Sequence, residues 1–161
     1  MSEEDDQNRA ADYFERAYQH QMDGELDEAV ELYKKSIELH PTAEAHTFLG
    51  WTYSFMRRYE EAIAECRRAI EIDPDFGNPY NDIGAYLIEM GSLDEAIPWL
   101  EKATRARRYE NYCFPHYNLG RVYERKSNWN QAKQCYLASL RHNPKYTLAQ
   151  ASLRRLQAMA N

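Results

Sequence analysis

Two stretches of the chain repeat one arrangement of apolar and polar residues. Residues 24–33 read GELDEAVELY, and residues 91–100 read GSLDEAIPWL. In the second stretch Leu93, Ile97 and Leu100 are spaced by four and three residues, which places them on one face of an α-helix. The pattern therefore predicts that each of the two stretches forms an amphipathic helix that begins just after its glycine. Gly91 is expected to end the preceding helix in a left-handed conformation.

The same landmarks recur with a period of about 34 residues. The alanine of the phrase occurs four times, at intervals of 33, 34 and 36 residues: Ala29, Ala62, Ala96 and Ala132. A Leu-Gly or Ile-Gly pair precedes three of these alanines by 12 or 13 residues. Such periods are typical of stacked helix pairs. We predict four repeats and a closing helix, at about 10–42, 43–76, 77–110, 113–146 and 146–159.

These residues and spacings resemble the tetratricopeptide repeat family over residues 10–146. The second unit carries Leu49, Gly50, Tyr53, Ala62, Ala69 and Pro74, and the third carries Tyr80, Ile83, Gly84, Ala96 and Ala103. The resemblance implies an all-α fold, an α-solenoid (right-handed superhelix) of stacked antiparallel helix hairpins. Small residues such as Gly84 and Ala96 are expected to let neighbouring helices approach closely. Two departures are Arg108, where the family has proline, and the added residues YENY that follow it.

The composition indicates which class of protein this is and in which compartment we expect it. A chain of 161 residues with 43% hydrophobic and 29% charged residues suits one globular domain, here residues 10–161. The acidic start MSEEDDQN predicts a disordered tail over residues 1–9. It has no signal-peptide character, and no apolar run approaches the roughly 18 residues that span a bilayer. We expect a cytoplasmic protein without membrane contact.

Charge is distributed unevenly along the chain. Residues 1–100 carry 8 basic and 23 acidic side chains, whereas residues 101–161 carry 12 and 3, which gives −15 against +9. The acidic half weighs against nucleic-acid binding, although RARR at 105–108 could be either a solvated face or a local phosphate contact. The opposite charges also suggest head-to-tail self-assembly into a homo-oligomeric scaffold, an alternative function.

The family resemblance implies that the first helix of each repeat lines a binding groove. Carried onto this chain, the groove positions are Phe14, Tyr18, Phe48, Trp51, Phe55, Phe114 and Tyr117 among aromatic residues, and Asn78, Asn81, Asn118, Arg121 and Arg125 among polar ones. Aromatic and arginine side chains are common anchors of binding surfaces. The leading hypothesis is an adaptor that binds a peptide or helix of another protein. Phe48 and Trp51 could instead be core residues between repeats.

The arginines suggest recognition of a carboxylate. Asn118, Arg121 and Arg125 share a helix face, and Arg155 follows on the closing helix. These side chains either converge on an acidic group of the partner or remain solvated and neutralised by Glu124. The clamp that some family members use for chaperone tails is not expected, because Phe14, Tyr18, Phe48, Asn78 and Asp82 occupy its positions.

Catalytic and metal chemistry have little support in the sequence. Cys113 and His116 form a C-x-x-H pair, with Cys135 and His142 further on, but zinc sites usually need four ligands in paired close spacings. We expect Cys66, Cys113 and Cys135 to be structural, reduced thiols, since three cysteines cannot all pair. No phosphate loop or hydrolase motif is present, so we predict neither enzymatic activity nor a cofactor.

Overall fold

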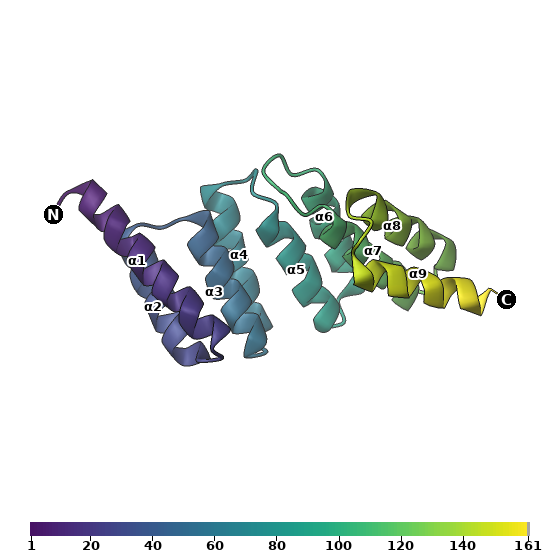
Figure 1. Ribbon diagram of the computed structural model, residues 1–161, viewed down its shortest axis with the longest axis horizontal. Helices are drawn as coiled ribbons and strands as arrows, with labels where there is room; N and C mark the ends of the chain where they lie inside the picture. The colour runs from purple at the N-terminus through teal and green to yellow at the C-terminus, as the bar shows by residue number, and fades with distance from the viewer. Residues whose placement is uncertain (161) are drawn as a thin grey trace. The chain divides into compact units, whose positions relative to one another are not determined.

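Helices joined by short turns form the chain, as the repeated landmarks predict (Figure 1). The computed structural model describes residues 1–160, and it divides the chain into unit 1 (Met1–Pro74) and unit 2 (Asp75–Asn161), where the sequence suggested one domain. Unit 1 contains α1 (Glu3–Met22), α2 (Leu26–Leu39), α3 (Ala43–Phe55) and α4 (Tyr59–Ile72). Unit 2 contains α5 (Asn78–Glu89), α6 (Leu93–Thr104), α7 (Cys113–Arg125), α8 (Trp129–His142) and α9 (Thr147–Met159).

Successive helices pack as antiparallel hairpins within each unit. In unit 1, α1 packs on α2, α2 on α3 and α3 on α4. In unit 2, α5 packs on α6, α6 on α7, α7 on α8, and α9 closes against α8. The described helices, with no strand among residues 1–160, confirm the predicted all-α fold class. Among these residues no helix is both long and apolar enough to cross a membrane.

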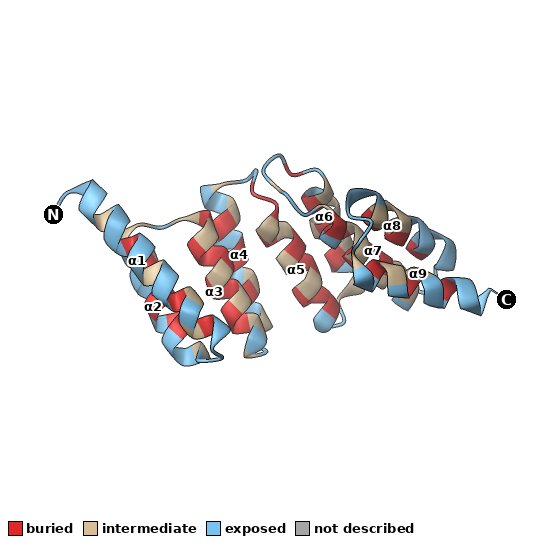
Figure 2. Ribbon diagram, viewed as in Figure 1, coloured by how far each residue is buried: buried red, intermediate tan, exposed pale blue. Residues whose placement is uncertain are grey.

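The repeated alanines lie at the centre of the packing. Ala29, Ala62, Ala96 and Ala132 are all fully buried. Figure 2 shows buried residues along the sides of the helices that face a neighbour, and exposed residues on the outer sides. Because each of these buried positions carries only a methyl group, the paired helices can approach closely there, and the period in the sequence marks their contact points.

Each turn within a hairpin contains one residue in the left-handed region, two positions before the second helix. Gly24 and Gly91 have φ of 80° and 81°, which confirms the left-handed stop predicted at Gly91. Arg57 and Ser127 adopt φ of 59° at the equivalent places. A non-glycine residue costs about 1–2 kcal/mol in this conformation, so hairpin packing must offset that cost in the second and fourth turns.

The connection between α6 and α7 explains one departure from the family pattern, the arginine at position 108. Phe76 and Arg108 form an isolated parallel bridge, in which Arg108 N donates to Asp75 O at 2.9 Å and Gly77 N donates to Arg108 O at 3.0 Å. The Arg108 guanidinium lies 4.1 Å from the centre of the Phe76 ring. Proline at position 108 would remove one of these donors, so the bridge accounts for arginine there.

The N-terminal segment differs from the prediction of a disordered tail, because α1 begins at Glu3. Ser2 Oγ accepts from Asp5 N at 3.1 Å, and Asp5 Oδ2 accepts from Ser2 N at 3.2 Å, which forms a capping box. Four acidic residues in the first turn also complement the positive end of the helix dipole. Composition suggested disorder, whereas the spacing of Ser2 and Asp5 is a signal for a helix start.

Candidate protein-binding surface

Five aromatic residues of α1 and α3 form a continuous cluster in unit 1. We call Phe14, Tyr18, Phe48, Trp51 and Phe55 the aromatic strip. The Phe48 ring centre lies 5.2 Å from Phe14, 6.0 Å from Tyr18 and 5.8 Å from Trp51, each in an edge-to-face arrangement. Trp51 continues to Phe55 at 5.1 Å. The structure therefore brings together all five aromatic residues that the sequence singled out in this part of the chain.

The aromatic strip is anchored from the core side by Tyr33 of α2. The Tyr33 ring is fully buried and lies 5.5 Å from Phe14. Its hydroxyl donates to Gln21 Oε1 at 2.7 Å, and burial raises its pKa well above the ordinary value. Phe14, Tyr18, Phe48 and Trp51 are half-buried above it, and Phe55 is 55% exposed. The strip thus has a fixed base and a solvent-facing side.

A pocket of about 720 Å³ lies beside one end of the aromatic strip. Phe14, Tyr18 and Phe48 line it together with residues that the sequence analysis did not select: Gln7, Ala10, Ala11, Glu15, Ser36, His40, Thr42 and Glu44. Its size falls in the range of about 300–1,000 Å³ that is usual for ligand sites. No local sequence signal identifies this pocket, because its walls come from three helices.

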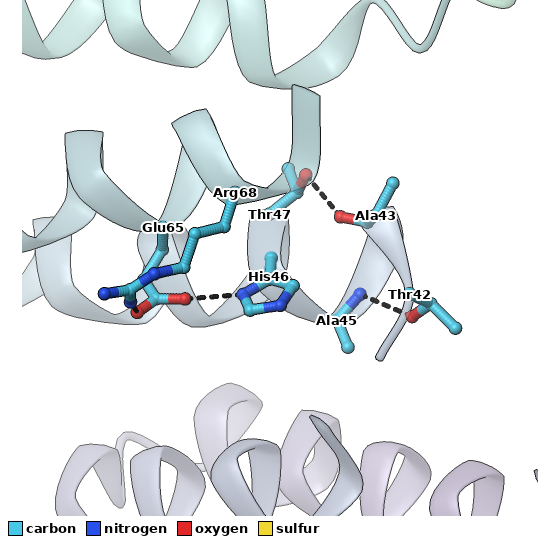
Figure 3. Close-up of polar contacts among 7 residues, drawn as sticks. All are labelled: Thr42, Ala43, Ala45, His46, Thr47, Glu65 and Arg68. Atoms are coloured by element: carbon cyan, nitrogen blue, oxygen red, sulfur yellow. Dashed lines mark hydrogen bonds and ion pairs between the residues drawn. The ribbon is translucent and has the colours of Figure 1, made fainter. Parts of the chain in front are cut away.

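A buried polar contact joins α3 to α4 in unit 1. Figure 3 shows Glu65 and Arg68 of α4 beside His46 of α3. His46 Nδ1 lies 2.7 Å from Glu65 Oε2, and each side chain is about one-tenth exposed. The second carboxylate oxygen of Glu65 accepts from Arg68. At the start of α3, Thr42 Oγ1 accepts from Ala45 N at 3.0 Å, so the helix is capped beside this contact.

In unit 2 the polar residues of the predicted groove form a network between α5 and α7. Asn118 Nδ2 donates to Asn81 Oδ1 at 3.0 Å. Arg121 donates from Nη1 to Asn118 Oδ1 at 3.1 Å and from Nη2 to Glu89 Oε1 at 3.0 Å. Asn78 lies apart from this network, on a pocket of about 200 Å³ that Phe76 and Tyr109 also line.

The remaining arginines of the predicted carboxylate site are engaged with groups of this chain. Arg155 Nη2 donates to the two carboxylate oxygens of Glu124 at 2.7 and 2.8 Å. Tyr136 donates to the same carboxylate at 2.8 Å, and Arg125 Nη1 donates to Ile88 O at 3.2 Å. The alternative of local neutralisation by Glu124 therefore describes Arg155, whereas Arg121 is paired with Glu89.

Two further aromatic residues of the prediction meet the closing segment of unit 2. Phe114, which is 38% exposed, lies 5.3 Å from Tyr146 between ring centres. Tyr117 lies 5.3 Å from Tyr146 and 5.8 Å from the buried Tyr136. Burial raises the pKa of Tyr146 to about 12, so its hydroxyl stays protonated at neutral pH. These rings form a second, smaller aromatic surface.

Asp82 is a titratable residue of α5, next to Asn81 of the polar network between α5 and α7. Burial raises the pKa of Asp82 to about 7, although the hydrogen bond with the Asn81 side chain lowers it in part. The carboxyl therefore changes charge near neutral pH. In the sequence, Asp82 is notable only as a departure from the chaperone-tail clamp, and neither spacing nor composition indicates the burial of its carboxyl.

The cysteines and histidines do not gather into a ligand set in the part of the chain that the structure describes. No group of three or more His, Cys, Asp or Glu side chains in residues 1–160 could hold a metal ion. Cys66 and Cys113 are buried and form no disulfide, and burial raises the pKa of the half-buried Cys135 to about 11. Burial also raises the pKa of Cys113, so the thiols of Cys113 and Cys135 are protonated at neutral pH.

Comparison with known proteins finds matches to a family of repeat proteins. Profiles of the tetratricopeptide repeat match residues 43–76, 78–109 and 113–146. The chain is 32% identical over 75 residues to small glutamine-rich tetratricopeptide repeat-containing protein 2 of Mycosarcoma maydis. That match covers 46% of this chain and 21% of the relative, so the chain spans about a fifth of that protein's length.

Solved structures show the same fold. PilF of Pseudomonas aeruginosa aligns with a TM-score of 0.89 at 23% identity, covering 96% of this chain and 70% of PilF. YrrB, described as a tetratricopeptide repeat protein with an unusual peptide-binding site, aligns with a TM-score of 0.73 at 20% identity and covers 90% of this chain and 74% of YrrB. At these identities the similarity concerns the fold alone.

Proposed function

Because this chain belongs to the tetratricopeptide repeat family, we propose that it is a non-catalytic adaptor whose aromatic strip binds a segment of another protein. Proteins of this family are typically scaffolds that bind other proteins or peptides. The peptide-binding site of YrrB offers a precedent on the same fold. The partner segment would be a peptide or a helix that lies along the first helices of the repeats.

The observation that carries this proposal is the solvent-facing side of the aromatic strip. Phe55 is 55% exposed at the end of α3, and Trp51 is half-buried beside it. Exposed aromatic surface is unfavourable in water, and aromatic side chains supply much of the binding energy at interfaces. A ring cluster that is rigid on its core side loses little conformational entropy when a partner covers it.

Unit 2 offers its own set of contacts for a partner protein. We propose that Phe114 and Tyr117 supply apolar contacts there, and that Arg121 or Arg155 binds an acidic group. Because Glu89 and Glu124 now accept from these arginines, the acidic group would have to replace one of them. Such an exchange gives specificity rather than a large gain in affinity.

The adaptor proposal is tested by affinity capture from the native cell extract, with bound proteins quantified by mass spectrometry. We expect Phe55→Ala to lower capture of at least one protein about tenfold, because it removes an exposed anchor with little effect on the core. Trp129→Ala is the matched control, since Trp129 is 46% exposed on a second helix. Equal capture by wild type and both variants contradicts binding at the aromatic strip.

The distribution of charge supports head-to-tail self-assembly as a second candidate function. Unit 1 contains 18 acidic and 8 basic side chains, and unit 2 contains 8 and 12, so their net charges are −10 and +4. Opposite charges on two copies attract most strongly at low ionic strength. We expect the mass from light scattering to rise with protein concentration at about 20 mM salt and to fall to the monomer at about 500 mM. A monomer under both conditions rejects this candidate.

A further inference from the structure

The pocket of unit 1 lies along one continuous stripe of α1. Its lining residues on this helix recur every three or four positions, with neighbouring pairs at two of the turns: Gln7, Ala10, Ala11, Phe14, Glu15 and Tyr18. At 1.5 Å per residue the stripe is about 17 Å long. The facing walls are formed by Ser36 and His40 at the end of α2 and by Glu44 and Phe48 of α3. The pocket is therefore elongated in the way that suits a chain segment.

The interior of the pocket is apolar. Ala10 and Ala11 line it on α1, and the rings of Phe14 and Phe48, whose centres lie 5.2 Å apart, add aromatic surface. Ser36 Oγ donates to Ala10 O at 2.7 Å, so this hydroxyl is already satisfied within the chain. An apolar or aromatic side chain could enter without leaving that polar group unpaired.

Carboxylates surround this apolar interior. Glu15 and Glu44 line the pocket, and Glu3 and Glu4 lie one turn before Gln7 on the same stripe of α1. No lysine or arginine is among the described residues that line it. Arg9 and Arg16 lie on the opposite side of α1, at 3.9 and 3.8 Å from Asp6 and Asp12.

We propose that the pocket of unit 1 binds an apolar or aromatic side chain of a partner segment that has lysine or arginine on both sides of it. The apolar side chain packs against Phe14 and Phe48, and the flanking cations meet Glu15, Glu44 and the acidic start of α1. The inference rests on the proposed adaptor function and adds the chemistry of the partner. The net charge of −10 on unit 1 favours approach of such a segment.

Fluorescence anisotropy with two labelled octapeptides tests the proposal on the full chain. One probe is Gly-Arg-Lys-Trp-Leu-Lys-Arg-Gly, and the other is its acidic counterpart Gly-Glu-Glu-Trp-Leu-Glu-Glu-Gly. We expect the basic probe to bind at least about tenfold more tightly than the acidic probe, because only its flanks complement the carboxylates. Ala11→Arg, which places bulk and positive charge in the pocket at an exposed position, should weaken the basic probe about tenfold.

Two matched variants separate the pocket from the general charge of unit 1. Ala64→Arg makes the same change at an exposed alanine of α4 and should leave binding of the basic probe unchanged. The double variant Glu15→Lys, Glu44→Lys should weaken binding, whereas Glu60→Lys, Glu71→Lys alters the net charge equally at exposed sites of α4 and should have less effect.

Three results overturn the inference. The first is equal binding of both probes, and the second is an equal effect of the pocket variants and their controls. The third combines two findings: Ala11→Arg removes no binding of the probes, but it does remove the fluorescence of bound anilinonaphthalene sulfonate. In that case the pocket takes a small apolar molecule. Loss of the pocket inference leaves the adaptor proposal standing if capture still depends on Phe55, so the two fail separately.

Discussion

Replacement of Gly84 by alanine should destabilise unit 2 by about 2 kcal/mol, because the added methyl group has no room. A Cβ atom at this position would lie 2.3 Å from Leu100 Cδ2 and 2.4 Å from Leu100 Cγ. Leu100 is fully buried, so its side chain cannot turn away into solvent. Glycine-to-alanine changes inside exposed helices usually stabilise by about 1 kcal/mol, so the sign of the effect identifies packing as the cause. Thermal unfolding should show a decrease in Tm of about 5 °C.

The double variant with Leu100→Ala is the control for this experiment. Leu100→Ala alone should cost about 3 kcal/mol through the cavity it leaves, and Gly84→Ala should cost almost nothing further in that background. Gly91→Ala provides a second comparison, because its added methyl group meets nothing within 4 Å but its φ is 81°. A neutral or stabilising effect of Gly84→Ala in the wild-type background contradicts the proposed steric conflict.

Glu65→Leu should lower the free energy of unfolding of unit 1 by about 3 kcal/mol. The carboxylate of Glu65 is 2.7 Å from His46 Nδ1, and both side chains are nearly buried. Leucine fills much of the space but leaves the His46 ring without its partner in a site closed to water. Arg68 is 58% exposed and keeps its hydration, so its lost pairing contributes little. Urea unfolding followed by circular dichroism measures the difference.

A double-mutant cycle isolates the contact between His46 and Glu65. His46→Leu should be destabilising for the same reason as Glu65→Leu, but the double variant should lose about 2 kcal/mol less than the sum of the single variants, since neither residue is then left unpaired. Arg68→Leu should change stability by less than about 1 kcal/mol. Additive effects of the first two changes exclude an energetic coupling between these side chains.

The interior of each hairpin could be predicted from the order of residues. Ala29 and Ala96 occupy one place in a repeated phrase, and both are fully buried. This worked because helix periodicity and the need for small residues at close contacts are local properties that a sequence displays directly. The residue types of Arg57 and Ser127 do not indicate a left-handed conformation, and only their register with Gly24 and Gly91 marks these positions.

The binding surface was predictable only in part. The family resemblance placed Phe48, Trp51 and Phe55 in one groove, and the structure joins them ring to ring. The sequence did not reveal that Arg121 pairs with Glu89, 32 residues away. It left open whether Arg155 pairs with Glu124, 31 residues away. Such pairs depend on which side chains face each other across neighbouring helices. The distances between these side chains cannot be derived from a single sequence.

The repeat period, the helix pairs and their buried small residues thus follow from short-range patterns in the chain, because 3.6-residue periodicity links sequence directly to helix faces. The helical start at Glu3 was also encoded locally, in the spacing of Ser2 and Asp5, but the acidic composition concealed it. The pocket, by contrast, exists only where α1, α2 and α3 pack together. Its apolar interior and acidic border arise from side chains far apart in sequence, and three-dimensional packing alone brings them to one place.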